Sequence, residues 1–328
     1  MPIKTTFGAN QNNIHSGPGF LFLNALRPLY GMQPILDGNN PPSLVDPPTP
    51  AAWLATTPYT IGEMALDSNN NVQICTTAGT SGSSGPSWNT SVGGATADGS
   101  TLNWTLAGPS WVWKASAATT LDQQIRDANG NVQQCIVAGT SAASAPTWST
   151  VYGGLSQDGT AQWQNYGPTL ASGAGDGTMD FQAQSKLMAV DADQYTAPIG
   201  QRLVGEEAKL SATLRELQMT TVARSLPNAV YNSGSNPNFA TNSQSYEEVT
   251  FGGLVVVPMP CLVLASPRPN FANPCKYVVG TLYKAAAGSN GQLPFSLKKI
   301  TDFKVDWTGN AITWRPAGDQ IGQIYRQL

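Results

Sequence analysis

Apolar and polar residues alternate along several stretches of the chain, and this alternation predicts β-strands. It is clear at residues 19–26 and again at 178–190, where Phe181, Ala183 and Leu187 fall at near-alternate positions. Successive side chains of a strand point to opposite faces, so a strand with one buried face repeats with a period of two. Further stretches with strand character are residues 209–217, 249–257, 276–283 and 295–307.

One short segment has helical spacing instead. Val222 and Leu226 lie four positions apart, and the segment 218–226 ends before Pro227, which disfavours helix in the residue that precedes it. The following stretch, 228–244, is rich in Asn, Ser, Gly and Pro and predicts a long loop. Together these patterns predict an all-β fold with one short helix, a β-sandwich or a barrel.

The middle of the chain contains an internal repeat. The segment that starts at Asp67, DSNNNVQICTTAGTSGSSGPSWNTSVGGATADG, recurs sixty positions later from Asp127 as DANGNVQQCIVAGTSAASAPTWSTVYGGLSQDG. Each copy has an Asn-rich turn and an Asp-Gly pair, which predict hairpins because Asn and Gly tolerate positive φ. We therefore expect two small β modules, module 1 at residues 51–109 and module 2 at residues 110–168.

The two modules are expected to be an insertion looped out of a larger domain. Pro-rich sequence at 40–51 and Gly-rich sequence at 172–177 flank them and are typical of linkers. The larger domain would then comprise residues 1–50 and 169–328. The modules carry a net charge of -4 and the remainder of the chain +1, so the acidic character is concentrated in the modules.

Composition narrows the function classes. Charged residues make up 11% of the 328 residues, less than half of the roughly 25% usual in soluble domains, and clustered Lys and Arg suited to tight DNA binding are lacking. His15 is the only histidine, which argues against a His-based metal site or a catalytic triad. We therefore predict no catalytic residue, no cofactor and no metal site.

Cysteine spacing and hydropathy indicate the cellular compartment in which the protein is made. The four cysteines, Cys75, Cys135, Cys261 and Cys275, form no CxxC pair, and buried, reduced thiols are the simplest interpretation. The longest apolar stretch, 251–265, is broken by prolines and is too short to cross a bilayer as a helix. The start of the chain lacks the apolar region of a signal peptide. We expect a protein made in the cytoplasm, without membrane insertion.

One motif resembles the start of a calcium-binding loop. Asp67-x-Asn69-x-Asn71, together with its second copy, matches the first ligands of a calcium loop. Positions six and twelve of such a loop need Gly and Glu, but Val72 and Ala78 stand there. A hairpin turn is the better interpretation.

The tryptophans of the modules allow two interpretations. Trp88 and Trp104 recur at equivalent strand-like positions and are expected to form the module cores, since a unit this small has few other residues to bury. An aromatic face also binds the apolar face of a sugar ring. Aromatic residues near the first positions of each module are the candidates for exposed glycan contacts: Trp53, Tyr59, Trp111 and Trp113.

Two runs outside the modules resemble a known family. The run GTMDFQAQSKLMAVDADQYTAPIGQRLVGEEAKLSATLREL has a Gly-x-x-x-Phe strand, an Asp followed by a Pro-Ile step, and a strand that ends in a Leu-x-Glu-Leu helix start. The run KYVVGTLYKAAAGSNGQLPFSLKKITDFKVDWTG carries a Tyr-Lys-Ala strand and a closing strand. Both resemble tail tube (major tail) proteins of long-tailed bacteriophages. The residues that carry the first match are Gly177, Phe181, Asp191, Pro198, Ile199 and 214–217. The two modules are similar to Trp- and Gly-rich add-on modules of phage structural proteins and, distantly, to carbohydrate-binding modules.

The resemblance implies a structural protein of the virion tail. Such proteins form hexameric rings that stack around a DNA channel, and they meet tape-measure, baseplate and terminator proteins. DNA passes through without specific binding, and a mildly acidic lumen suits this because it repels phosphate. The candidate lumen-facing acidic residues are Asp180, Asp191, Asp193, Glu206 and Glu207.

The modules leave an alternative open. On this alternative the chain is a glycan-binding adhesin or a carbohydrate-binding accessory protein, and the modules are its functional part. Under the tail tube hypothesis the same modules decorate the outside of the tube and contact a host surface polysaccharide weakly, with avidity from many copies.

Overall fold

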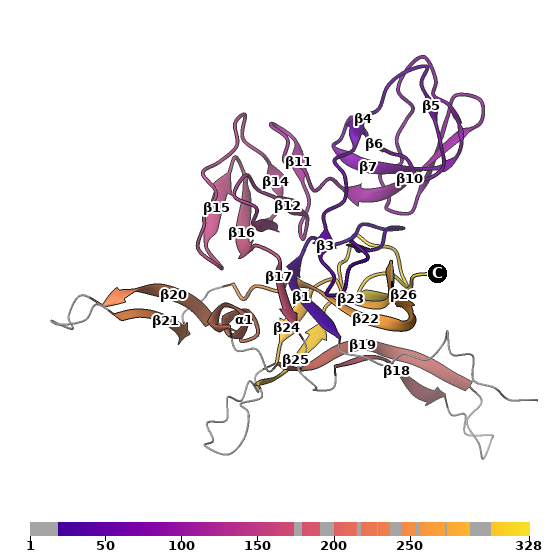
Figure 1. Ribbon diagram of the computed structural model, residues 1–328. Coiled ribbons are helices and arrows are strands. Elements are labelled where there is room, and N and C mark those ends of the chain that lie inside the picture. Colours follow the sequence, from indigo (N-terminus) through magenta and orange to yellow (C-terminus); the bar gives the residue numbers. More distant parts are fainter. Residues whose placement is uncertain are drawn as a thin grey trace, which may run out of the picture.

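The computed structural model describes residues 19–173, 179–190, 200–214, 218–227, 229–236, 244–252, 256–272, 274–288 and 303–328 (Figure 1). Strands dominate this part of the chain, and it contains one helix, α1 (Met219–Arg224). The predicted all-β class is confirmed, as is the short helix expected at 218–226.

Two sheets form the larger domain. The first has the strand order β17 (Leu170–Gly173), β1 (Phe20–Ala25), β22 (Cys261–Ala272), β23 (Cys275–Leu282) and β26 (Gly322–Arg326). The second has the order β18 (Asp180–Val190), β19 (Gly200–Leu214), β25 (Phe303–Gly309) and β24 (Ala285–Ala287). Both sheets are antiparallel throughout and neither closes on itself over the described residues, so the domain is a sandwich.

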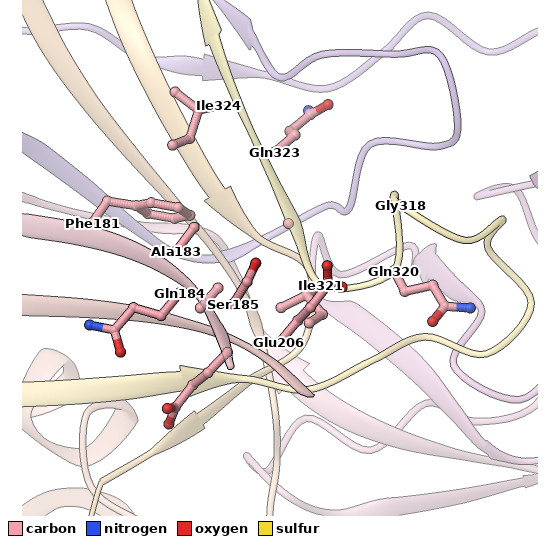
Figure 2. A pocket seen from close by; sticks show the side chains of 13 residues that line it. Phe181, Ala183, Gln184, Ser185, Glu206, Gly318, Gln320, Ile321, Gln323 and Ile324 are labelled. Carbon is pink, nitrogen blue, oxygen red and sulfur yellow. The ribbon is translucent and has the colours of Figure 1, made fainter. Parts of the chain in front are cut away.

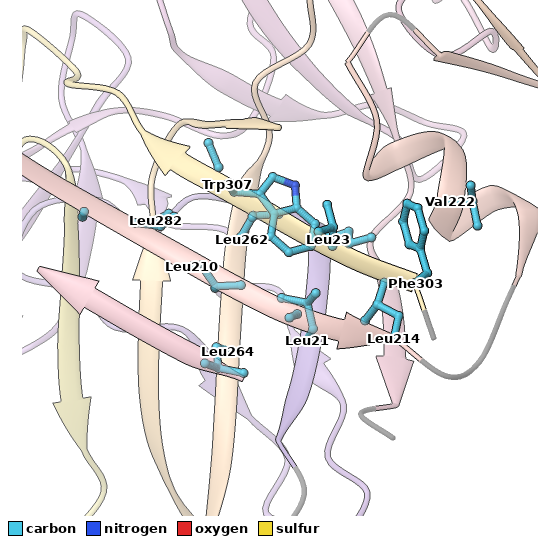
Figure 3. Close-up of a cluster of buried hydrophobic side chains, with 14 residues drawn as sticks. Leu21, Leu23, Leu210, Leu214, Val222, Leu262, Leu264, Leu282, Phe303 and Trp307 are labelled. Atoms are coloured by element: carbon cyan, nitrogen blue, oxygen red, sulfur yellow. The ribbon is translucent and has the colours of Figure 1, made fainter. Parts of the chain in front are cut away.

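The main core lies between these two sheets (Figure 3). Leu21 and Leu23 of β1 point into it, and Trp307 of β25 fills its centre from the opposite sheet. Phe22, between the two leucines, points to the other face of the first sheet and packs there with Tyr277. The first sheet is therefore buried on both faces, which explains why 261–265 is continuously apolar rather than alternating.

The modules leave and rejoin the sandwich at neighbouring strands. β1 pairs with β17 in antiparallel register, with Phe20 opposite Gly173. Everything between these strands in sequence is thus inserted at one edge of the first sheet. Residues 172 and 173, predicted as linker, belong to strand β17, because their backbone groups complete the hydrogen bonding along β1.

Each module builds its own sheet, in which neighbouring strands are antiparallel except that residues 51–52 pair in parallel with residues 65–66 in module 1. The strands of module 1 are β4 (Ala51–Ala52), β5 (Pro58–Tyr59), β6 (Met64–Leu66), β7 (Asn71–Thr77), β8 (Gly79–Thr80), β9 (Ala95–Asp98) and β10 (Leu102–Pro109). The strands of module 2 are β11 (Ala118–Thr119), β12 (Gln124–Arg126), β13 (Val132–Val137), β14 (Gly139–Thr140), β15 (Leu155–Asp158) and β16 (Ala161–Gly167). The order β6-β7-β10-β9 in module 1 repeats as β12-β13-β16-β15 in module 2, so the sequence repeat is a repeat of structure. A short pair, β2 (Ile35–Leu36) and β3 (Leu44–Val45), precedes module 1.

Two long ribbons project from opposite sides of the sandwich (Figure 1). One is the outer part of β18 and β19, and the other is β20 (Ala229–Asn236) paired with β21 (Gln244–Phe251). The loop predicted for 228–244 is wrong over residues 229–236. These residues form a strand because β21 supplies a full set of backbone partners, which overrides their turn-forming composition.

Candidate functional site

Module 1 is organised around a buried carboxylate. Oδ2 of Asp98 accepts hydrogen bonds from the indole nitrogens of Trp53 (2.8 Å) and Trp104 (3.0 Å). Oδ1 accepts the backbone N–H of Gly82 at 2.8 Å. Both indoles pack edge to face against Trp88, with ring centroids 6.4 Å and 6.1 Å away. One aspartate therefore fixes the orientation of the aromatic core, and Trp104 is fully buried as expected.

Module 2 repeats this arrangement. Asp158 accepts the indole N–H groups of Trp113 (2.8 Å) and Trp163 (3.1 Å) at Oδ2 and the backbone N–H of Ala142 (2.8 Å) at Oδ1. Trp148 packs edge to face on Trp163 at 6.0 Å. The Asp-Gly pair of each repeat thus supplies a buried acceptor as well as a turn. Sequence reasoning assigned only the turn, although the joint recurrence of this Asp with two Trp residues was a signal for the second role.

The four glycan candidates lie in or against the module cores. Trp53 and Trp113 are half-buried, and their N–H groups are committed to the aspartates. Tyr59 is half-buried, its hydroxyl accepts a backbone N–H, and its ring packs against Trp104 at 4.7 Å. Trp111 is only 6% exposed, so the exposure expected for it is wrong. It is buried because it lies where module 1 meets the sandwich. A glycan contact at the other three stays a prediction.

In module 1, a groove of about 360 Å³ lies beside one of the four candidates, Trp53. Trp53 and Trp88 line it, and Lys114 of module 2 borders it. The two rings stand at 81° to each other, so they form a corner rather than a flat platform. At most one of the two rings at a time could lie flat against a sugar.

The calcium-like motif is a closed turn. Oδ1 of Asp67 accepts the backbone N–H groups of Asn69 and Asn71, both at 2.8 Å, and Oδ2 accepts the amide of Gln73 at 2.9 Å. Asp127 has the equivalent partners in module 2. The predicted hairpin is confirmed in both copies. The carboxylates bind donors of their own chain, which leaves them poorly placed for a cation.

Module 2 joins the sandwich through buried charges. Arg27, directly after β1, donates to the carbonyl oxygens of Tyr283 (2.7 Å) and Asp122 and to Oε1 of Gln134 (3.0 Å). The Asp122 carboxylate pairs with Lys284 at 2.8 Å. Burial lowers the pKa of the Arg27 guanidinium, and the charge of Asp122 opposes that shift. Sequence reasoning missed this network because the partners of Arg27 lie 95 or more positions away.

Module 1 joins the sandwich through apolar contacts instead. Leu26 and Leu29, in the segment after β1, pack against the base of module 1, and the backbone N–H of Tyr30 donates to the Ala107 carbonyl at 3.0 Å. The buried residues of this junction are Leu26, Leu29, Val72, Ala107 and Trp111. Both modules are therefore fixed to the body of the protein rather than tethered to it.

The root of the β18–β19 ribbon borders a groove of about 330 Å³ (Figure 2). Phe181, Ser185 and Glu206 contribute from the ribbon, and Gly318 with residues 320–324 forms the facing wall. That wall includes part of β26, which is the edge strand of the first sheet. The groove thus lies beside the edge of the first sheet.

The candidate lumen-facing acids do not all lie on one face. Asp180 and Glu207 share a face of the ribbon, whereas Glu206 points to the opposite face, because successive side chains of a strand alternate. Glu207 contacts Lys209 (3.0 Å) and Lys186 (3.7 Å), and the hydrogen bond from Lys209 lowers the pKa of this carboxyl. The other two candidates, Asp191 and Asp193, lie outside the described residues.

In the described part of the chain, no three His, Cys, Asp or Glu side chains gather closely enough to hold a metal ion. All four cysteines are buried and unpaired with one another, as predicted. No helix among the described residues has the length and apolar character needed to cross a membrane.

The sequence matches no protein-family model and no curated protein.

Proposed function

We propose that the chain is a structural subunit that assembles into stacked rings, as a tail tube (major tail) protein of a long-tailed bacteriophage. The rings are hexameric and surround a DNA channel, and the two modules stand on the outer surface. The proposal is supported by the resemblance of two runs to that family. Those runs supply β18, β19, β23 and β25, which belong to the two sheets of the sandwich.

The observation that carries the proposal is the exposed apolar surface of the β18–β19 ribbon. Leu187 and Leu203 lie opposite each other and are 56% and 50% exposed. Met188 and Val204 of the same ribbon are also exposed. A two-stranded ribbon is at best marginally stable alone, and exposed apolar strands mark sites of association. Burial of this ribbon against neighbouring subunits stabilises its two strands and removes its apolar side chains from water.

The placement of the modules also suits a tube subunit. Because both modules are anchored by buried contacts, each copy along a tube holds them in one fixed orientation. Weak contacts between many such modules and a host surface polysaccharide then add up through avidity. The net charge of -3 suits a channel through which DNA passes without binding.

Sedimentation velocity tests the proposal. The wild-type protein is expected to show a discrete oligomer and larger stacked species as its concentration rises. A Leu187→Ser, Leu203→Ser variant removes apolar surface from one face of the ribbon and is expected to stay monomeric. Leu54→Ser and Ile61→Ser are the matched control, because both residues are exposed on module 1. A wild-type protein that remains monomeric at all concentrations would overturn the proposal.

A further inference from the structure

The two projecting ribbons differ in charge. The outer half of the β18–β19 ribbon, residues 186–190 and 200–205, carries Lys186 and Arg202 and no acidic residue. The β20–β21 ribbon carries Glu247 and Glu248 and no basic residue. One ribbon is therefore cationic over its outer half, and the other is anionic.

The charged groups of both ribbons face solvent. The Lys186 side chain is 66% exposed, and its contact with Glu207 is long, at 3.7 Å. Arg202 is exposed and lies opposite Met188, on the same face as Lys186. Glu247 and Glu248 are exposed as well.

The anionic ribbon presents a carboxylate on both of its faces. Glu247 and Glu248 are consecutive residues of an extended strand, so their side chains point in opposite directions. Glu247 accepts the Tyr231 hydroxyl at 2.7 Å, and Glu248 accepts the amide of Asn232 at 3.3 Å. Each carboxylate is thereby held near its own ribbon, and whichever face meets a partner offers one negative charge.

Both ribbons also expose apolar side chains beside their charges. On the face of the cationic ribbon that carries Lys186 and Arg202 these are Met188 and Val190, and Leu187 and Leu203 lie exposed on its opposite face. On the anionic ribbon they are Tyr246 and Phe251, and Phe251 is 68% exposed. An apolar centre with charges at its side is the composition of a protein interface, and opposite charges select partner and register.

We propose that the cationic half of the β18–β19 ribbon of one subunit packs against the β20–β21 ribbon of the next subunit, with Lys186 and Arg202 facing whichever of Glu247 and Glu248 lies on the contacting face. The ribbons project from opposite sides of the sandwich (Figure 1), so the contact is head to tail. A head-to-tail contact repeats from copy to copy and closes into a ring when the rotation per copy allows it. This inference rests on the ring assembly proposed above and names the contact that forms it.

Charge reversal tests the contact. The Lys186→Glu, Arg202→Glu variant makes both ribbons acidic, and the Glu247→Lys, Glu248→Lys variant makes both basic. Each variant alone is expected to need at least 10-fold more protein to assemble than the wild type. An equimolar mixture is expected to regain assembly, because alternating copies restore opposite charges at every contact. The variant with all four reversals in one chain is expected to assemble alone.

The controls separate this inference from the proposed function. Lys114→Glu with Lys304→Glu makes the same change in net charge at exposed residues outside both ribbons, and it is expected to assemble like the wild type. Unchanged thermal unfolding of all variants shows that the reversals leave the fold intact. If the wild type assembles and the reversed variants do so equally well, or if the mixture and the fourfold variant fail to recover, the ribbon contact is wrong while ring assembly stands. If the wild type does not assemble, the proposed function itself fails.

Discussion

Replacing Asp98 by Ala tests whether one buried carboxylate holds module 1 together. The change removes the acceptor shared by the N–H groups of Trp53, Trp104 and Gly82. Trp104 is fully buried, so its N–H finds no water in exchange, and an unsatisfied buried donor costs about 1–3 kcal/mol. The other two donors belong to half-buried residues, so each lost hydrogen bond costs roughly half as much as that of Trp104. The total fall in the free energy of unfolding is about 4 kcal/mol.

Hydrogen exchange with peptide-level mass spectrometry measures this loss locally. A loss of about 4 kcal/mol corresponds to roughly a 1,000-fold fall in the protection of amides that exchange by unfolding of the module. We expect that fall in β7 and β10 of module 1, with little change in β13 and β16 of module 2. Asp158→Ala is expected to give the mirror image, since the two sites share one geometry.

A matched variant isolates the effect of burial from the effect of charge. Glu63→Ala removes an exposed carboxylate of the same module that accepts the backbone N–H of Thr60, and it is expected to lower the free energy of unfolding by about 1 kcal/mol or less. Wild-type protection of β10 in Asp98→Ala would exclude this role of the Asp98 carboxylate. An equal loss of protection in Glu63→Ala would exclude it as well.

Three further experiments probe the module junction, a turn and the thiols. Arg27→Met breaks the buried network below module 2 and is expected to lower the free energy of unfolding of that module by about 3–5 kcal/mol. The measurement is the loss of amide protection in β16, and full protection there would contradict the expected loss. Gly99→Ala places a Cβ 2.3 Å from a backbone carbonyl oxygen at φ +61°, so we expect a loss of about 2 kcal/mol or more in a urea titration. Gly130→Ala also has a positive φ but meets no atom within 4 Å, and an equal loss in both variants would show that the close contact is irrelevant. Burial raises the pKa of Cys135 to about 11 and of Cys261 to about 12, so a thiol-specific colour reagent at pH 8 is expected to react only after unfolding; rapid labelling of the native protein would count against this burial.

The local pattern of residues was sufficient to predict the fold class and the repeat. The alternation at 178–190 gave β18, and the helical spacing before Pro227 gave α1. The Asn-rich turns gave the hairpins of both modules, because turn chemistry depends on a few adjacent residues. These features are decided within about ten residues of sequence.

Features that depend on distant partners were not predictable in this way. The strand at 229–236 forms because β21 pairs with it, although its composition is that of a loop. Trp111 is buried by the segment after β1, about eighty positions earlier in the chain. Arg27 donates to the backbone carbonyl of Asp122 across the junction of two units, and neither residue has a local pattern that marks it as buried.

Electron microscopy of the purified wild-type protein at high concentration tests whether this chain forms the proposed rings around a channel. The expected images are end-on views of closed six-fold rings with an open centre, and side views of stacked rings with the modules as knobs on the outer wall. A field of isolated monomers, or of aggregates without a channel, would rule out ring assembly.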